Sequence, residues 1–309
     1  MSTAWAVGTV EVGGEPLVVI EVGEHLYEVG RAAQALLGRA SSEVSVLGLL
    51  EKWEPSTAKL VELAEAIVNG DAEEFAVAAH DGWLAPILHP RKVIGVGANY
   101  KDHLDFAGIP YPKTPYLFLK PASTTLLGHD RTLTIPSRVG YPDWEGELGV
   151  VIGQRARNIP VAEALSFIAG YTPANDFSAR DWLADAIPPL GSDWLLHKGW
   201  DGFTPIGPLI TPASLVDDPQ ALTIRLSVDG EIKQDGNTSK MVFSVAELIA
   251  HASTVLTLEP GDVILTGTPL GSGMAVVPQQ RLTPGQTMVL EVEGLGTLRT
   301  PTVAEGEQA

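Results

Sequence analysis

The chain has 309 residues, of which 45% are hydrophobic, and it carries a formal net charge of −18 at pH 7. This length allows two domains, or one large core with an appendage, and the charge argues against a nucleic-acid partner or an anionic membrane surface. The chain has no cysteine, which excludes disulfides and thiol chemistry.

No charged segment followed by an apolar stretch opens the chain, and no apolar run approaches the roughly 18 residues of a membrane span. A cytoplasmic protein without a membrane partner is therefore expected.

The first 85 residues differ in pattern from the rest. Residues 17–21 begin with four apolar side chains, three of them β-branched, which predicts a strand, and residues 31–37 favour a short helix. A second helix is predicted over residues 56–68, where apolar side chains recur at helical spacing, with Gly70 as its stop.

From about residue 86 the pattern becomes β-rich, with frequent Gly and Pro. One helix interrupts it: Ser244 and Glu247 have the spacing of a capping box, so a helix is expected up to Leu256, closed by Pro260 and Gly261. Residues 304–309 are expected to fray. Strands are predicted at 92–97, 117–120, 148–152, 223–228, 263–266 and 288–292.

Two acids, Glu145 and Glu147, stand at the start of the predicted strand 148–152. Residues i and i+2 of a strand point to the same face, so these carboxylates lie side by side with no basic residue between them. A hard divalent cation such as Mg²⁺, Mn²⁺ or Ca²⁺ would relieve their repulsion. Taken alone, two solvated acids at a strand end would explain the pair as well.

Five segments, taken in order, resemble the motifs of the fumarylacetoacetate hydrolase family. These segments are Gly95–His103, Asp143–Gly153, Gly170–Trp182, His197–Pro208 and Thr266–Pro269. The resemblance implies an α+β protein in which a β-rich, mixed-sheet β-roll catalytic domain spans residues 86–309. It also implies a small N-terminal α+β domain over residues 1–85, with the boundary in Leu84–Pro90, and assembly as a homodimer.

The resemblance also implies a metal site and a substrate class. Asp176, in the segment Asn175–Asp181, completes a Glu145, Glu147 and Asp176 ligand set. Three carboxylates leave about half of an octahedral shell open, which a small anionic 2-oxo acid could fill with a carboxylate and a keto oxygen. The ion would polarise that carbonyl and stabilise an enolate.

Further substrate contacts follow from the same resemblance. Lys198 would face the substrate and stabilise negative charge. Thr268 and Gly267 resemble a small anion nest for the substrate carboxylate. His197 stands where the family has a small residue, and Arg180 is expected to pair with Asp181 beneath the site.

His103 is the candidate general base, since a histidine titrates near neutrality and can activate water. Several family members place a glutamate three residues later on a lid helix, where this chain has Phe106. Phe106 favours an apolar lid and a bulkier or aromatic substrate. Glu291 resembles a strand acid that orients the histidine in the fumarylacetoacetate-cleaving branch.

These residues favour hydrolysis of a carbon–carbon bond in an acylpyruvate, because His103 is present and Glu291 could assist it. The missing lid glutamate keeps other chemistries open: decarboxylation of a 2-oxo diacid, hydration, or isomerisation. A binding protein with a decayed site is a further alternative. Against it, three carboxylates and Lys198 together form a cluster that is costly to hold without an ion.

Overall fold

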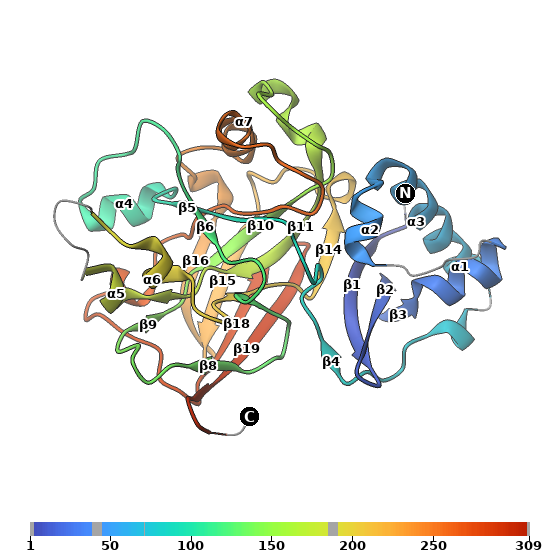
Figure 1. The fold of residues 1–309 in the computed structure, drawn as a ribbon, viewed down its shortest axis with the longest axis horizontal. Coiled ribbons are helices and arrows are strands. Elements are labelled where there is room, and N and C mark those ends of the chain that lie inside the picture. The colour runs from blue at the N-terminus through green and yellow to red at the C-terminus, as the bar shows by residue number, and fades with distance from the viewer. Residues whose placement is uncertain (1–2, 39–44, 71, 185–190, 308–309) are drawn as a thin grey trace.

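The computed structural model describes residues 3–38, 45–70, 72–184 and 191–307 (Figure 1). The protein has an α+β fold built on several sheets, with no closed barrel among these residues. In Figure 1 the N-terminal helices lie at the right and the short helices α4, α5 and α6 at the left, with the sheets between them. Within the described ranges, no helix is long and apolar enough to cross a membrane.

The largest sheet has ten strands in the order β3-β2-β1-β14-β11-β10-β17-β5-β6, with β4 beside β1. The sheet is mixed, because β17 and β5 are parallel to each other, whereas β17 is antiparallel to β10 and β5 is antiparallel to β6. Its strands are β1 (Trp5–Val12), β2 (Glu15–Val22), β3 (His25–Glu28), β4 (Gly82–Trp83), β5 (Val93–Gly97), β6 (Tyr116–Lys120), β10 (Gly146–Ile152), β11 (Ile168–Asn175), β14 (Leu209–Pro212) and β17 (Val263–Leu265).

A five-stranded sheet of order β16-β15-β18-β19-β8 provides the second layer of the core. Its strands are β8 (Leu133–Ile135), β15 (Thr223–Val228), β16 (Glu231–Asn237), β18 (Thr287–Val292) and β19 (Gly296–Ala304). Two short pairs complete the strands: β9 (Pro142–Asp143) with β12 (Ser178–Ala179), and β7 (Leu126–Leu127) with β13 (Thr204–Pro205).

The helices lie around these sheets and are mostly short. The α-helices are α1 (Val29–Leu37), α2 (Val46–Leu50), α3 (Trp53–Asn69), α4 (Lys101–Ala107), α5 (Arg180–Ala184), α6 (Trp194–Lys198) and α7 (Val245–Val255). The 3-10 turns are η1 (Glu73–Phe75), η2 (Val161–Phe167), η3 (Ala213–Leu215), η4 (Thr238–Lys240) and η5 (Gly273–Ala275).

The predicted elements are present. The six strands expected after residue 86 correspond to β5, β6, β10, β15, β17 and β18, and residues 17–21 lie within β2. The predicted helices correspond to α1, α3 and α7, and Gly70 caps the end of α3. The capping box of α7 is formed: the Ser244 side chain accepts from the Glu247 N–H, and the Glu247 carboxylate accepts from the Ser244 N–H at 2.8 Å.

The N-terminal segment shares the large sheet with the rest of the chain. β1 pairs with β14 at Val7 and Ile210, so the strands of the first part extend the sheet that contains β10 and β11. Val7 and Leu63 belong to the same buried cluster as Val151 and Ile210. The predicted boundary at residues 84–90 falls between β4 and β5, and the division into two domains stays a prediction.

The expected fraying of residues 304–309 is wrong for the part that the structure describes. Ala304 ends β19, and the Glu305 N–H donates to the Ile135 carbonyl at 3.1 Å. The Glu305 carboxylate also accepts from the N–H and hydroxyl of Ser137 at 2.9 and 2.6 Å. These bonds fix the chain end against β8; residues 308–309 lie outside the described range.

Candidate active site

β10 and β11 bring the three predicted acids together. Glu145 precedes β10 and Glu147 lies within it, while Asp176 follows β11, its antiparallel neighbour. The Asp176 N–H donates to the Glu145 carbonyl at 2.9 Å, which fixes the register of the strand ends. One carboxylate oxygen from each acid lies within 4.8 Å of those of the other two, and all three residues are buried.

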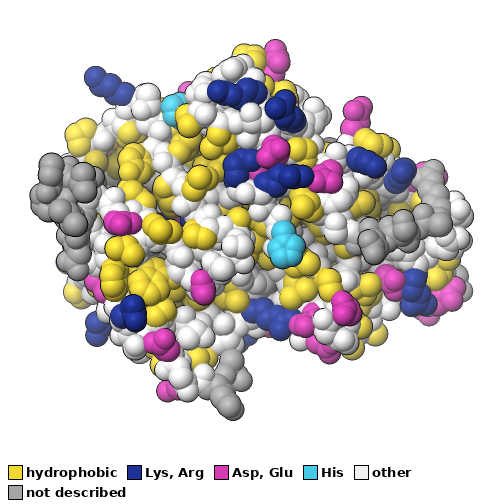
Figure 2. Space-filling model, viewed as in Figure 1, with side chains coloured by type: hydrophobic (Ala, Val, Ile, Leu, Met, Phe, Trp, Pro, Cys, Tyr) yellow, Lys and Arg dark blue, Asp and Glu magenta, His cyan; other side chains and the backbone are white. Residues whose placement is uncertain are grey.

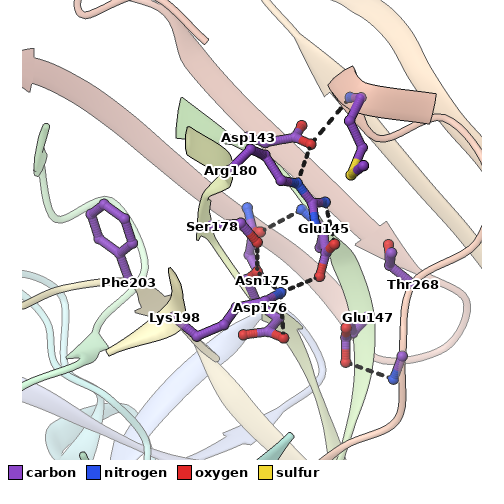
Figure 3. A network of polar contacts seen from close by, with 12 residues as sticks. Asp143, Glu145, Glu147, Asn175, Asp176, Ser178, Arg180, Lys198, Phe203 and Thr268 are labelled. Atoms are coloured by element: carbon purple, nitrogen blue, oxygen red, sulfur yellow. Dashed lines mark hydrogen bonds and ion pairs between the residues drawn. The ribbon is translucent and has the colours of Figure 1, made fainter. Parts of the chain in front are cut away.

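Lys198, at the end of α6, bridges two of these acids (Figure 3). Its Nζ contacts the Glu145 carboxylate and lies 2.7 Å from Asp176 Oδ2 and 3.0 Å from the Asp176 carbonyl oxygen. Burial alone would lower the pKa of Lys198, but Asp176 and Glu145 outweigh it and raise the pKa. The structure thus places the lysine predicted to face the substrate at the centre of the acidic cluster.

Lys120 is a second buried ammonium at the site, and no sequence motif singled it out. It ends β6, its side chain is fully buried, and its Nζ donates to Asp176 Oδ1 at 2.5 Å and to the Phe203 carbonyl at 2.6 Å. Burial lowers the pKa of Lys120 despite the attraction of Asp176. The side chain therefore orients Asp176 from the side opposite Lys198.

Arg180 pairs with Asp143 and Glu145, so the expected pairing with Asp181 is wrong. Its Nε donates to Asp143 Oδ2 at 2.8 Å, and its terminal nitrogen contacts the Glu145 carboxylate (Figure 3). Asp181 instead accepts from backbone N–H groups at 2.8 and 3.1 Å. The fork of the guanidinium explains this, since it can hold two carboxylates at once. Burial would raise the pKa of Glu145, but Arg180 and Lys198 lower it to about 2.

Of the three acids, Glu147 is the one with no ion pair in the described part of the chain. Its Oε2 accepts from the Gly267 N–H at 2.8 Å, and burial together with Asp176 and Glu145 raises its pKa well above the usual value. A buried carboxylate beside two others is unfavourable unless a cation joins them. Oxygen donors in this number and spacing fit a hard divalent ion, and Glu145, Glu147 and Asp176 would hold it.

Gly267 and Thr268 make different contacts from those expected. Gly267 has a φ of +94°, and a Cβ there would come within 2.9 Å of the Asn99 Cβ, so the turn that aims its N–H at Glu147 needs glycine. Thr268 lines the cavity, but its hydroxyl donates to the Gly146 carbonyl at 2.9 Å and accepts from Gln234 at 2.8 Å. Both groups thus support the strand end that carries Glu147, and their role as an anion nest stays a prediction.

His103 lies on α4 and lines a cavity of about 190 Å³ that is also lined by the three acids and Lys198. Its Nδ1 is buried and has no hydrogen-bond partner within the described part of the chain. Burial lowers the pKa of the imidazole, which keeps it neutral at pH 7 and able to accept a proton. The structure therefore brings the candidate base to the acidic cluster.

Glu291 and Phe106 do not join this cavity. Glu291 is exposed on β18, where its strand neighbours are Arg225 and Thr297, and neither it nor Phe106 is among the described residues that line the cavity. Phe106, on the same helix as His103, is 45% exposed. Alternation along β18 turns Glu291 away from the core, so the structure does not support its role in orienting His103.

The fold and the buried cluster define an enzyme-like metal site of carboxylates backed by lysines. The chain belongs to the fumarylacetoacetate hydrolase family, since its residues 92–303 match the model described as fumarylacetoacetate (FAA) hydrolase C-terminal.

Relatives of this chain catalyse different reactions. A mitochondrial oxaloacetate tautomerase from Xenopus laevis is 42% identical over 220 residues, which are 71% of this chain and 68% of that protein. The solved 5-carboxymethyl-2-hydroxymuconate delta-isomerase from Mycobacterium smegmatis is 30% identical with a TM-score of 0.71, covering 98% of this chain and 100% of its own. Maleylpyruvate hydrolase from Sphingobium sp. SYK-6, solved with manganese(II) and pyruvate, is 25% identical with a TM-score of 0.76, covering 97% and 99%.

Proposed function

We propose that this protein is a divalent-metal-dependent hydrolase that cleaves the carbon–carbon bond of an acylpyruvate. The observation that supports the proposal is that His103 lines the same cavity as the three acids and Lys198. Water adds to the distal carbonyl, the bond to the central methylene breaks, and the products are pyruvate and a carboxylic acid. The manganese(II) and pyruvate of the solved maleylpyruvate hydrolase are consistent with this proposal.

The residues divide the chemistry between them. A divalent ion held by the three acids supplies a Lewis acid for the 2-oxo acid carbonyl. Lys198 offers an ammonium beside that position, where it stabilises developing negative charge. His103, neutral because of its burial, accepts a proton from water in the same cavity. Arg180 and Lys120 hold Glu145 and Asp176 in place during turnover.

Keto–enol tautomerisation of a 2-oxo acid is the second candidate. It is favoured by the tautomerase relative and by the absence of an acid bonded to His103 Nδ1 within the described residues. Moving a proton to and from one carbon needs a single base, whereas water activation gains from an orienting acid. We also propose a cytoplasmic location and assembly as a homodimer. Sedimentation that shows a monomer at micromolar concentration would contradict the homodimer.

Product analysis separates the two candidates. The wild type, His103→Ala and Lys198→Ala are incubated with an acylpyruvate and Mg²⁺ or Mn²⁺, and Glu291→Gln serves as a control outside the cavity. We expect stoichiometric pyruvate and carboxylic acid from the wild type, and a roughly 10²–10⁴-fold loss for His103→Ala. The control should retain activity. Enolisation without pyruvate release would establish the second candidate instead.

A further inference from the structure

One wall of the cavity is apolar and aromatic. Ile109, Phe118, Leu183 and Trp194 line it, together with His197. The Phe118 and Trp194 rings are stacked with centroids 4.8 Å apart, and Trp194 and His197 are 5.5 Å apart. We call these five residues the aromatic wall. The helices beside it also expose apolar side chains, including Phe106, Leu195 and Leu196. Figure 2 shows hydrophobic side chains exposed at the left of the molecule, where these helices lie, as well as elsewhere on this face.

The charges of the site nearly cancel one another. Four carboxylates (Asp143, Glu145, Glu147 and Asp176) face three cations (Lys120, Arg180 and Lys198), which leaves one negative charge in excess. A divalent ion changes this to one positive charge, which a single substrate carboxylate neutralises. Each of the three cations contacts at least one of these carboxylates. The described residues that line the cavity offer no further cation, so a second substrate carboxylate at the aromatic wall would lack a counterion among them, which is costly in a buried site.

His197 is the polar member of this wall and does not supply that counterion. Burial, Lys198 and Arg180 lower the pKa of its imidazole to about 2, so the ring is neutral at pH 7. It is 1% exposed, and both ring nitrogens are buried without a hydrogen-bond partner in the described structure. Buried polar atoms are normally bonded, so two unbonded nitrogens in a cavity wall indicate a neutral ligand group that meets them.

Building on the proposed acylpyruvate chemistry, we propose that the substrate is a monocarboxylic 2-oxo acid with an uncharged apolar or aromatic tail. The tail packs on the aromatic wall, and His197 hydrogen-bonds the uncharged oxygen of the distal acyl carbonyl that carries the tail. The substrate class therefore differs from the dicarboxylate named for the oxaloacetate tautomerase relative.

Binding of unreactive 2-oxo acids tests the tail without turnover. The probes are 2-oxoglutarate and 5-methyl-2-oxohexanoate, whose terminal isopropyl group has the shape of the second carboxylate. With the full chain and Mn²⁺, calorimetry should show the neutral probe binding about tenfold or more tightly. Turnover should follow the same order, with benzoylpyruvate preferred over succinylpyruvate by a similar factor in kcat/KM. Tighter binding and faster turnover of the dicarboxylates would overturn this inference and leave C–C hydrolysis intact.

Two His197 variants test the hydrogen bond. His197→Phe keeps a planar ring without nitrogens, and His197→Gln keeps a neutral donor and acceptor. We expect His197→Phe to raise KM for benzoylpyruvate about three- to tenfold. The Kd of 5-methyl-2-oxohexanoate, which lacks the distal acyl oxygen, should stay within about twofold of the wild-type value. His197→Gln should recover part of the loss. Equal effects on both ligands, or none on either, would overturn the assigned contact.

The outcomes separate this inference from the function on which it rests. Selective binding of the neutral probe without cleavage of either acylpyruvate would contradict the proposed hydrolysis and support the tail assignment. Binding of neither probe in the presence of Mn²⁺ would overturn both. Thermal unfolding of each variant checks that a lost signal does not come from a lost fold.

Discussion

Replacing Glu147 with glutamine should make the metal-free protein more stable and abolish its response to metal. Glu147 is 1% exposed and lies beside two other carboxylates, and the Gly267 N–H is its hydrogen-bond donor. Burial and the carboxylates of Asp176 and Glu145 raise the pKa of Glu147, and this rise reflects the free-energy cost of holding its charge in the fold. Glutamine has nearly the same shape and keeps an oxygen for the Gly267 N–H, but it brings no charge.

The size of both effects can be worked out. Removing an uncompensated buried polar or charged group relieves on the order of 1–3 kcal/mol. At roughly 2–4 °C per kcal/mol, the variant should unfold about 2–12 °C above the wild type in a chelator. A divalent ion at a hundred times its Kd adds about 2.7 kcal/mol to the wild type. The wild type should therefore gain about 5–10 °C with metal, and Glu147→Gln close to none.

Thermal unfolding of both proteins, in a chelator and with Mg²⁺ or Mn²⁺, measures these shifts. A variant that is less stable than the wild type in the chelator would contradict the unpaired charge of Glu147. A variant that gains as much from metal as the wild type would contradict its role as a ligand.

Three further predictions concern the groups around this carboxylate. Because burial lowers the pKa of His103, the unfolded chain binds more protons than the folded chain just below about pH 6.5. The free energy of unfolding should therefore rise with pH up to that value, and it should rise less in His103→Gln. The acid limb of the pH profile of kcat/KM should also lie below pH 6.5. Lys120→Met should weaken Mn²⁺ binding roughly 10–100-fold in calorimetry, since a partner that orients a ligand is lost; unchanged affinity would deny that role. In urea unfolding, Arg180→Leu should lower the free energy of unfolding by roughly 3–5 kcal/mol, because it leaves buried carboxylates unpaired. The control Arg225→Leu, in an exposed ion pair, should lower it by under about 1 kcal/mol. Equal losses would contradict a stabilising role for the buried ion pairs.

Local pattern was enough to predict the strand that carries Glu145 and Glu147, because a two-residue spacing on an apolar strand fixes one face. The capping box before α7 was equally readable, since its hydrogen bonds join residues three apart. Placing Asp176 beside the two glutamates needed the family resemblance, because the contact joins the ends of two strands.

Contacts between distant residues were beyond the sequence. Lys120 and Asp176 are 56 residues apart, and a lysine at the end of an apolar strand is usually solvated. Arg180 was assigned to its neighbour Asp181, whereas pairing of β9 with β12 brings Asp143 within reach. Glu291 matched a family position in sequence, yet the alternation of β18 directs it to solvent.

The most direct test of metal-dependent C–C hydrolysis is a quantitative assay of pyruvate and carboxylic acid released from benzoylpyruvate. The chelated protein should release neither product, and Mg²⁺ or Mn²⁺ should restore both in a one-to-one ratio. Full release by the thoroughly chelated protein, or metal-restored enolisation with no pyruvate, would contradict the proposed function.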